Sequence, residues 1–402
     1  MSRIELIGIN GAVLTDEQRE LVRHCAAVVV SRRHRSLVAA LNRHLLDITP
    51  VATMLEQVAE VLPSGSVAVL ASGDPLFHGI GRSLIHRFGS ERITIHPALS
   101  AVQLACARFG LPWDDLVLLS LHGRSGHDLP GRILGHTRIL LLTDHRNSPD
   151  RVAASLLAAL EACNDGERIA ALRIRVAENL GLAEERLLSG SLADIAAQSF
   201  APLNIMVVEQ PPRTMPLFFG LRESEIRHSR GLITKDEVRA ATLHRLRLPA
   251  LGVMWDIGGG SGSVSLEAAR LASDLSMYTI EKNPEEQENI RANIRAYATY
   301  NMRLVAGEAP EALADLPDPD RIFIGGSGKR LEAIIETASI RLLAGGRIVI
   351  NAVLPTTATT ALSCLQRLGF QVTSATLAVT RTTYPDGAPQ VFNPITLITG
   401  DK

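Results

Sequence analysis

The chain has 402 residues, of which 46% are hydrophobic and 21% are charged, and its formal net charge is −1. This length predicts two or three domains of ordinary globular composition, each able to bury a core. The near-zero charge argues against a general attraction to nucleic acid or to membranes, and no apolar run reaches the length of a membrane span. Four cysteines lie far apart without C-x-x-C spacing, so we expect no metal site and buried thiols in a cytoplasmic protein: Cys25, Cys106, Cys163 and Cys364.

The first half of the chain alternates short apolar runs with helical segments, which is an α/β pattern. Strands are predicted at residues 4–9, 27–30, 66–70 and 93–95, and helices over about 15–25, from about 36, and over 80–88. Thr15 and Gln18 have the spacing of a capping box, which places the start of the first helix. Ser100 is placed to cap a further helix.

Two loops of this half follow predicted strands, where α/β sheets bind their ligands. The sequence Ser72-Gly73-Asp74-Pro75-Leu76-Phe77 follows the strand at 66–70; Asp74-Pro75 indicates a turn, and Gly73 permits close approach of the backbone to a ligand. The loop at residues 8–11 is a weaker signal, because an ordinary glycine turn explains it equally well. We expect it to serve substrate entry or binding.

A second lobe is predicted from residue 121 to about 202, with strands at 138–142, 169–173 and 205–208 and a helix at 148–163. Pro211, Pro212 and Pro216 then interrupt all periodicity, because prolines so close together sustain neither a helix nor a central strand. The predicted domains are therefore residues 1–210 and 223–402, joined by a linker at 211–222.

The clearest ligand signal of the chain lies in the second half, between a predicted strand ending at Ile257 and a helix at 264–271. Gly258, Gly260 and Gly262 alternate along this loop, and Glu281 ends the next strand, where the ribose-binding carboxylate of a βαβ unit falls. The dinucleotide fingerprint needs a glycine at the position of Ser263. The spacing therefore disfavours a nicotinamide dinucleotide.

Seven strands are predicted in this half, at 253–257, 277–281, 302–306, 321–324, 347–351, 371–379 and 394–399. The turn sequence Tyr384-Pro385-Asp386-Gly387 joins the last two into a hairpin, and Thr234 with Glu237 predicts a capping box for a helix before the first strand. This ending and the G-x-G-x-G loop resemble the class I S-adenosylmethionine-dependent methyltransferases, which have a seven-stranded Rossmann-like α/β fold. In that family the glycine loop meets the methionine part of the cofactor, and the acid holds the ribose hydroxyls.

The first half resembles the tetrapyrrole methylases over residues 1 to about 210. The resemblance lies in the SGDPLF string at 72–77, the loop at 97–100, Leu111-Pro112-Trp113 and Leu121-His122-Gly123-Arg124. It implies two α/β lobes with S-adenosylmethionine between them and C5 of a precorrin as the methylated position. The cofactor-binding residues that it implies are Gly73, Asp74, Leu76, Phe77 and Ser100.

The second half resembles the cobalamin-pathway methyltransferases that methylate C15 and remove the carboxyl group of the C12 acetate. The matching segments are residues 234–239, 256–262, 281–284, 307–313 and 325–328. The resemblance implies that Glu308 lies near the adenine of the cofactor. It implies that the remaining cofactor contacts are Thr234, Gly258, Gly259, Gly260, Ser261, Gly262, Glu281 and Ala309.

Together the two halves imply two S-adenosylmethionine sites and a small-molecule tetrapyrrole substrate, a precorrin or cobalt-precorrin, that is converted to precorrin-8 or its cobalt form. The family suggests a homo-oligomer. The substrate carries several carboxylates, so basic side chains near the sites are candidate partners: Arg32, Arg33, His122, Arg124, Lys235 and Arg381. For the arginines at 32–35, a solvated helix start is an equally good interpretation. No motif names the proton donor for the decarboxylation, so the catalytic residues stay unknown.

Two other functions are alternatives for this sequence. A methyltransferase acting on RNA or another nucleic acid normally holds a flipped base with an Asn-Pro-Pro-Tyr-like motif after the fourth strand, where this chain has Gly325-Gly326-Ser327-Gly328. A non-catalytic protein that only binds S-adenosylmethionine is the other alternative, and two separate loops argue against it.

Overall fold

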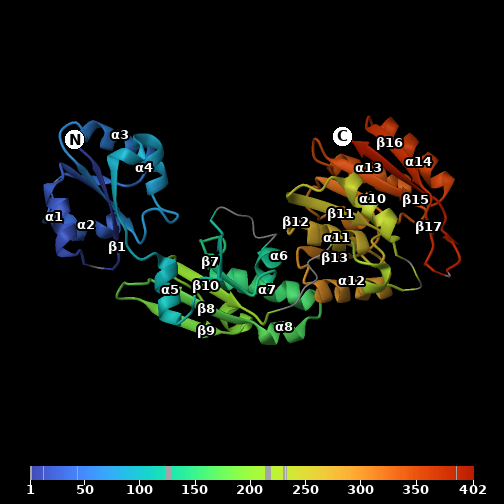
Figure 1. Cartoon of the computed structure of the whole chain (residues 1–402), viewed down its shortest axis with the longest axis horizontal. Helices are drawn as coiled ribbons and strands as arrows, with labels where there is room; N and C mark the ends of the chain where they lie inside the picture. Colours follow the sequence, from blue (N-terminus) through green and yellow to red (C-terminus); the bar gives the residue numbers. More distant parts are fainter. Residues whose placement is uncertain are drawn as a thin grey trace.

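The computed structural model describes residues 2–11, 13–42, 44–122, 129–212, 219–229, 231, 233–385 and 387–402. Three sheets follow one another along the chain and lie side by side in a row, with the middle one joining the two ends (Figure 1). None of the helices in these ranges is long and apolar enough to cross a membrane. The four cysteines are buried free thiols, as predicted.

The first sheet is parallel, with the strand order β3-β2-β4-β1-β5. Its core strands are apolar on both faces because helices cover both sides. The capping boxes of Thr15 with Gln18 and of Ser100 with Gln103 are both formed, which confirms these two helix starts. The strands are β1 (Ile4–Ile9), β2 (Ala27–Val30), β3 (Leu45–Asp47), β4 (Val67–Ser72) and β5 (Ile93–His96), and the helices are α1 (Asp16–His24), α2 (Arg35–Val38), α3 (Val51–Val61), α4 (Gly81–Phe88) and α5 (Ala101–Phe109).

The second sheet has the order β6-β7-β10-β8-β9, in which only β6 and β7 are parallel. The predicted strand at 169–173 is wrong: Asp165 caps a helix there by accepting a hydrogen bond from the Arg168 N–H at 3.2 Å, and the strand begins only at Arg173. The strands are β6 (Val117–Ser120), β7 (Arg138–Leu142), β8 (Arg173–Glu178), β9 (Arg186–Gly190) and β10 (Asn204–Glu209), and the helices are α6 (Leu129–Leu134), α7 (Pro149–Ala162), α8 (Gly166–Ala171) and α9 (Leu192–Ala196).

The third sheet contains the seven predicted strands in the order β13-β12-β11-β14-β15-β19-β16. The first five are parallel, and β19 runs antiparallel between β15 and β16. The strands are β11 (Leu251–Ile257), β12 (Asp274–Glu281), β13 (Met302–Ala306), β14 (Arg321–Ile324), β15 (Arg347–Ala352), β16 (Gln371–Leu377) and β19 (Ile395–Asp401); β17 (Thr380–Arg381) and β18 (Gln390–Val391) form a separate ribbon, and the helices are α10 (Asp236–Leu246), α11 (Ser263–Leu271), α12 (Pro284–Tyr297), α13 (Leu331–Arg341) and α14 (Pro355–Arg367).

The predicted capping box at the start of α10 is wrong. Lys235, not Thr234, is the N-cap residue, and no side chain caps the helix there. The Glu237 carboxylate is engaged elsewhere, because it accepts two hydrogen bonds from Arg381 at 2.8 and 2.6 Å. A tertiary ion pair has therefore replaced the local cap.

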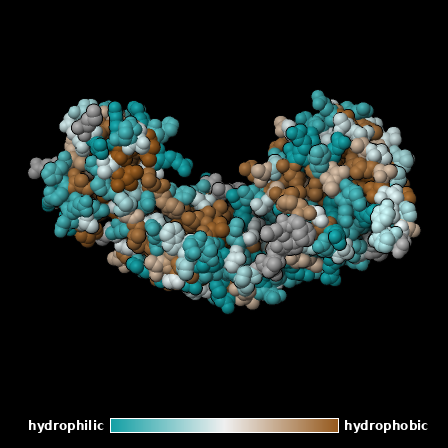
Figure 2. All heavy atoms as spheres, in the orientation of Figure 1, coloured by the Kyte–Doolittle hydropathy of each residue, from teal (hydrophilic) through white to brown (hydrophobic). Residues whose placement is uncertain are grey.

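The whole molecule has the shape of an arch. Figure 2 shows that its surface is hollowed between the first lobe, which contains the first sheet, and the third sheet. The second lobe contains the second sheet. Helix α5 packs on the second sheet, where Val102 and Cys106 join one apolar cluster with Leu140 and Val207. At the other end, Arg132 of α6 pairs with Asp274 of β12 at 3.0 Å. These contacts fix the order of the three sheets along the arch.

Candidate functional site

The loop between β11 and α11 has almost no room for side chains. Gly258, Gly260 and Gly262 have φ values of 69, 55 and 72°, in the left-handed region that favours glycine. A Cβ added at Gly258 lies 2.1 Å from the Gly326 carbonyl oxygen, and one at Gly262 lies 2.6 Å from Met302 Cε. The alternating glycines are therefore required by the packing of this turn, and they leave its backbone open to a ligand.

Glu281 closes this loop from the neighbouring strand. Its carboxylate accepts hydrogen bonds from the Gly260 N–H and the Asn283 N–H, both at 2.8 Å. The Gly307 N–H donates to the Glu281 carbonyl oxygen at 3.1 Å, which brings the end of β13 beside the end of β12. Glu308 follows there and pairs with Lys282 at 2.7 Å. The structure thus brings three of the predicted residues, Glu281, Glu308 and the buried Ala309, to one edge of the sheet.

Asp256 of β11 supports the glycine loop from the buried side. The sequence pattern did not indicate this role. The residue is 1% exposed, and its Oδ2 accepts hydrogen bonds from the Ser265 hydroxyl at 2.6 Å and the Ser265 N–H at 3.3 Å. Burial raises the pKa of Asp256 to about 6, against the opposing effect of these hydrogen bonds. Its only signal in the sequence is an acid in an apolar strand directly before the glycines.

Two buried polar atoms at the loop have no hydrogen-bond partner among the described residues: Asp256 Oδ1 and the Ser261 hydroxyl. A cradle without Cβ atoms, an unpaired hydroxyl and a carboxylate at the strand end together fit a ligand that carries ribose hydroxyls. The residues present therefore fit S-adenosylmethionine. Thr234 precedes α10, and its described hydrogen bond is the one that its carbonyl oxygen accepts from Arg239 at 2.9 Å.

Two predicted substrate residues, Lys235 and Arg381, lie together around Glu223. The Lys235 ammonium lies 2.6 Å and the Arg381 guanidinium 2.8 Å from the Glu223 carboxylate. The ring of Phe392 lies beneath both cations, 5.6 Å from Lys235 Nζ and 4.9 Å from Arg381 Cζ. Both cations are therefore already paired with carboxylates. The sequence pattern did not indicate Glu223 or Phe392, because each lies near only one of the two cations along the chain and meets the other through the fold.

A second site is a cavity of ≈ 260 Å³ between the first and second lobes. Three loops meet there at the carboxyl ends of β1, β4 and β5: the Gly73 N–H donates to the Ile9 carbonyl oxygen at 2.9 Å, and the Asn10 amide bonds the Leu99 backbone at 2.8 and 2.9 Å. Across the cavity, a Cβ at Gly11 would lie 3.0 Å from the Gly181 carbonyl oxygen. The lobes thus approach backbone to backbone at one rim of the cavity.

Three of the predicted residues line this cavity, namely Gly73, Arg33 and His122. The Arg33 guanidinium donates to the Ser72 hydroxyl at 2.5 Å, and burial lowers the pKa of Arg33. The loop at 8–11 also lines the cavity, through Asn10 and Gly11.

The other predicted residues of this half do not line the cavity. Asp74 accepts a hydrogen bond from the Leu76 N–H at 2.8 Å and so shapes the turn, while Ser100 caps α5. Leu76 is half exposed, and Phe77 stacks edge-on against His78. Arg32 is exposed, and Arg124 lies outside the described residues.

On the second-lobe side of the cavity the sequence indicated His122 but not the other polar residues. The other polar lining on this side comes from Thr143, Asn179 and Asn204, which follow β7, follow β8 and begin β10. The Thr143 hydroxyl donates to the Asn204 carbonyl oxygen at 3.1 Å. No local pattern identifies such residues, because they become neighbours only when β10 pairs with β7 and β8 in the second sheet.

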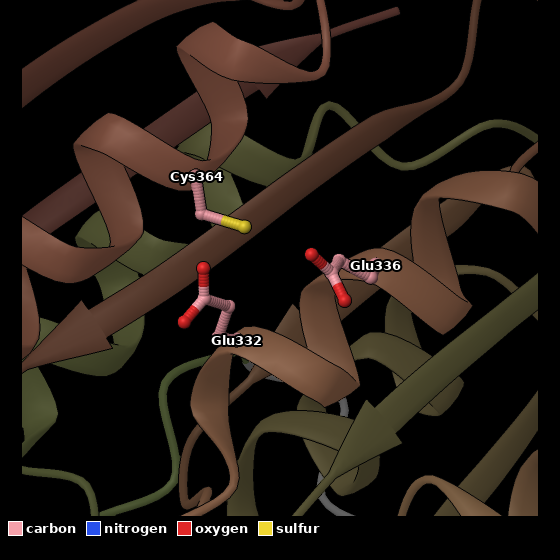
Figure 3. Close-up of side chains that lie close together, drawn as sticks. All are labelled: Glu332, Glu336 and Cys364. Atoms are coloured by element: carbon pink, nitrogen blue, oxygen red, sulfur yellow. The ribbon is translucent and has the colours of Figure 1, made fainter.

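Figure 3 shows a third group of polar side chains, Glu332 and Glu336 from α13 and Cys364 from α14, whose ligand atoms lie within 4.8 Å of one another. The Arg367 guanidinium already serves this group: it donates to both carboxylates at 2.8 Å and to the Cys364 sulfur at 3.6 Å. The arginine offsets part of the acidic charge and links the two helices, so the group is an ion-pair cluster.

Comparisons with known proteins match both halves of the chain. Residues 7–196 match the tetrapyrrole (corrin/porphyrin) methylases, and residues 225–399 match the precorrin methyltransferase domain. The precorrin-6Y C(5,15)-methyltransferase (decarboxylating) of a Sinorhizobium species is 36% identical over 355 residues, 86% of this chain and 83% of that protein.

Other relatives cover the second half alone. The probable cobalt-precorrin-6B C(15)-methyltransferase (decarboxylating) of Sulfolobus acidocaldarius is 36% identical over 188 residues, which cover 46% of this chain and 97% of that protein. A crystal structure of precorrin-6Y C5,15-methyltransferase from Geobacter metallireducens GS-15 is 43% identical, covers 47% of this chain and 100% of its own, and has a TM-score of 0.46. Because both halves match and one relative is similar over most of its own length and of this chain, the chain belongs to the family of precorrin-6Y C(5,15)-methyltransferases (decarboxylating).

Proposed function

We propose that this chain methylates precorrin-6Y at C5 and C15 and removes the carboxyl group of the C12 acetate, in cobalamin biosynthesis. The first two lobes carry out the C5 methylation, and the third sheet carries the C15 methylation and the decarboxylation. Membership of the family supports this reaction, and the two separate ligand sites support one S-adenosylmethionine in each half. The proposed domains are residues 1–210 and 223–402.

S-adenosylmethionine, when bound, supplies a methyl group on a sulfonium, so no nucleophile from the protein is needed. The protein's task is to position the ring carbon and to exclude water. In the second half, we propose that the backbone of the Gly258–Gly262 turn, Thr234, Glu308 and Ala309 hold the cofactor, with Glu281 on its ribose hydroxyls. Glu281 suits this role because it already accepts two N–H groups, which hold the carboxylate in place.

In the first half, we propose that the cofactor lies in the cavity between the lobes against Gly73, and that it extends past the cavity lining to the neighbouring Asp74, Leu76, Phe77 and Ser100. Arg33 and His122 line the same cavity and are the proposed contacts for substrate carboxylates. The Arg33 guanidinium is suited to this, because arginine stays charged and binds carboxylates through two N–H groups.

The observation that carries the proposal is the glycine turn closed by Glu281. The test is incubation of the full chain with S-adenosylmethionine and precorrin-6Y, or its cobalt form, followed by mass spectrometry. We expect two added methyl groups and the loss of one carbon dioxide. An unchanged mass with both rings contradicts the proposal.

The Glu281→Ala variant separates the two halves. We expect it to stop the C15 methylation and the decarboxylation. The C5 methylation should continue, because the cavity of the first half lies between the first and second lobes, away from Glu281. Glu332→Ala is the matched control, since this carboxylate is exposed on α13 and pairs with Arg367. A full loss of both methylations in Glu281→Ala, with the fold intact, would show that the halves do not work separately.

The Gly73→Val variant addresses the first half. Its φ of 67° disfavours any side chain, and the Leu99 carbonyl oxygen lies 3.3 Å from the added Cβ. We expect loss of C5 methylation with S-adenosylmethionine binding retained in the second half.

Self-association and a cytoplasmic location are further proposals. Light scattering after size-exclusion chromatography measures the oligomeric state, and cell fractionation tests the location.

A further inference from the structure

A wide cleft of ≈ 1360 Å³ opens on the third sheet, lined by the end of α10, the segment that leads into β11, and the first residues of β12, β14 and β15. These strands are parallel, so their first residues lie at the edge opposite to the glycine turn, which follows the last residue of β11. The cleft is therefore separate from the cofactor site described above.

The lining of this cleft carries an excess of positive charge. Five basic side chains face two acids, Asp274 and Asp401, and the basic residues are His244, Arg245, Arg247, Arg321 and Arg347. Both acids already have a partner, since Asp274 pairs with Arg132 at 3.0 Å and Asp401 with Arg347 at 2.5 Å. Within the described ranges, Arg245, Arg247 and Arg321 take part in no ion pair.

Two of the arginines are held in place by the end of α10. Arg321 Nε donates to the Leu246 carbonyl oxygen and Arg347 Nη1 to the Arg245 carbonyl oxygen, each at 2.8 Å. These bonds cap the helix, and they also fix the guanidinium groups close together. Burial lowers the pKa of Arg321, and the neighbouring Arg347 lowers it further, against the opposing effect of Asp320 and Asp401.

Arg247 adds a second observation. It ends α10 in the left-handed conformation, with φ 45° and ψ 62°, where glycine or asparagine is the favourable residue. An exposed, unpaired arginine at such a strained position, on the rim of a cleft with other arginines, indicates a use for its side chain. Crowded guanidinium groups without carboxylate partners favour the binding of an anion.

We propose that this cleft binds the carboxylate side chains of a tetrapyrrole and holds the ring while it passes between the two methylation sites. Several arginines spread over one cleft suit a ligand with several carboxylates, because a guanidinium without a carboxylate partner, such as that of Arg245 or Arg247, can bind one bidentately. The volume exceeds the roughly 300–1,000 Å³ of ordinary small-molecule pockets, so the cleft has room for a large ligand. The Arg132–Asp274 pair places the cleft beside α6, at the seam between the two halves (Figure 1). The transfer role rests on the proposed function; the anion site does not.

The binding test uses uroporphyrin, a porphyrin whose side chains all end in carboxylates, and follows its fluorescence on titration with the full chain at low salt. Arg245→Gln with Arg247→Asn removes two charges without disturbing the fold, since asparagine tolerates the left-handed conformation. We expect affinity to fall by about a hundredfold, because each of the two charge-assisted contacts contributes about tenfold. Arg3→Gln with Arg92→Gln, two exposed arginines at the far edge of the first sheet, is the matched control with unchanged affinity.

The turnover test measures how much singly methylated ring escapes into solution during the reaction of the full chain. We expect the double variant to release several times more of it than the wild type, with both methylations intact when S-adenosylmethionine and ring are saturating. Equal uroporphyrin affinity in the double variant and the wild type overturns the anion site, and equal escape of the intermediate overturns the transfer role. Weaker uroporphyrin binding without any precorrin turnover refutes the proposed function and leaves the anion site supported.

Discussion

At the scale of single residues, Asp256 is a buried acid whose ionisation opposes folding. Burial raises its pKa from 3.8 to about 6, so the folded state binds a proton more tightly than the unfolded state does. The contribution of Asp256 to the unfolding free energy is therefore largest below about pH 4. It decreases by about 3 kcal/mol in total as the pH rises to about 6. We expect Asp256→Asn to make the decline of the unfolding free energy between these values shallower, as measured by urea unfolding across pH.

The control for this prediction is Glu332→Gln, which makes the same replacement of a carboxylate by an amide at an exposed position on α13. Its unfolding free energy should follow the wild-type pH curve between pH 4 and 6, because no burial penalty is removed. Identical slopes for the wild type and Asp256→Asn would mean that Asp256 stays ionised throughout this range.

At the scale of elements, the ribbon of β17 and β18 is tied to α10 by Arg381. This guanidinium makes two hydrogen bonds to Glu237 and a further ion pair with Glu223. Arg381→Ala should release the ribbon from α10, because alanine makes none of these contacts. Arg381→Lys should hold the ribbon only in part, because an ammonium group does not bind a carboxylate bidentately. Hydrogen exchange of residues 380–391 measures this, with Arg330→Ala as the control, since it breaks a similar exposed pair with Glu311.

The pH dependence of this tie follows from its carboxylates. The hydrogen bonds from Arg381 lower the pKa of Glu237, and at Glu223 the bonds from Lys235 and Arg381 outweigh the burial that alone would raise its pKa. Groups with a lowered folded pKa stabilise above their unfolded value of 4.5 and lose that contribution as the pH falls below it. Exchange protection of the ribbon should thus be constant from neutral pH to about 4.5 and should fall only below it; a loss near pH 6 would contradict this assignment.

At the scale of the whole molecule, Gly131 of α6 sets how closely the second lobe approaches the third sheet. A Cβ at this position would lie 2.5 Å from Asn301 Cβ and 2.7 Å from its backbone nitrogen. Gly131→Ala should therefore push the two parts away from each other and weaken the contacts around them, such as the Arg132–Asp274 pair. We expect a larger radius of gyration in X-ray scattering and a lower unfolding temperature.

Gly166→Ala is the control for this prediction, because nothing lies within 4 Å of a Cβ there. It should leave the scattering curve and the unfolding temperature close to those of the wild type. An unchanged scattering curve in Gly131→Ala would show that Asn301 gives way locally and that the seam between the halves is adaptable.

Much of this fold was predictable because its signals are local. Helix caps join residues three apart, so the capping box of Thr15 with Gln18 and the cap at Ser100 were placed correctly. The strands of the third sheet were read from short apolar runs, which are largely buried on both faces in β12, β14 and β15. The same reasoning failed at residues 169–173, where an apolar run of helical length was taken for a strand, and at Thr234, where Glu237 prefers a partner far along the chain.

The sequence by itself determined the glycine turn and the acid beside it, because a positive φ and a strand-end carboxylate leave a pattern within one βαβ unit. Only the tertiary structure decided which side chains face one another across longer distances. Thr143 and Asn179 meet Gly73 across a cavity between lobes, Lys235 and Arg381 share Glu223, and arginines of α10, β14 and β15 crowd into one cleft. Such groupings depend on the packing of whole elements, which no spacing along the chain records.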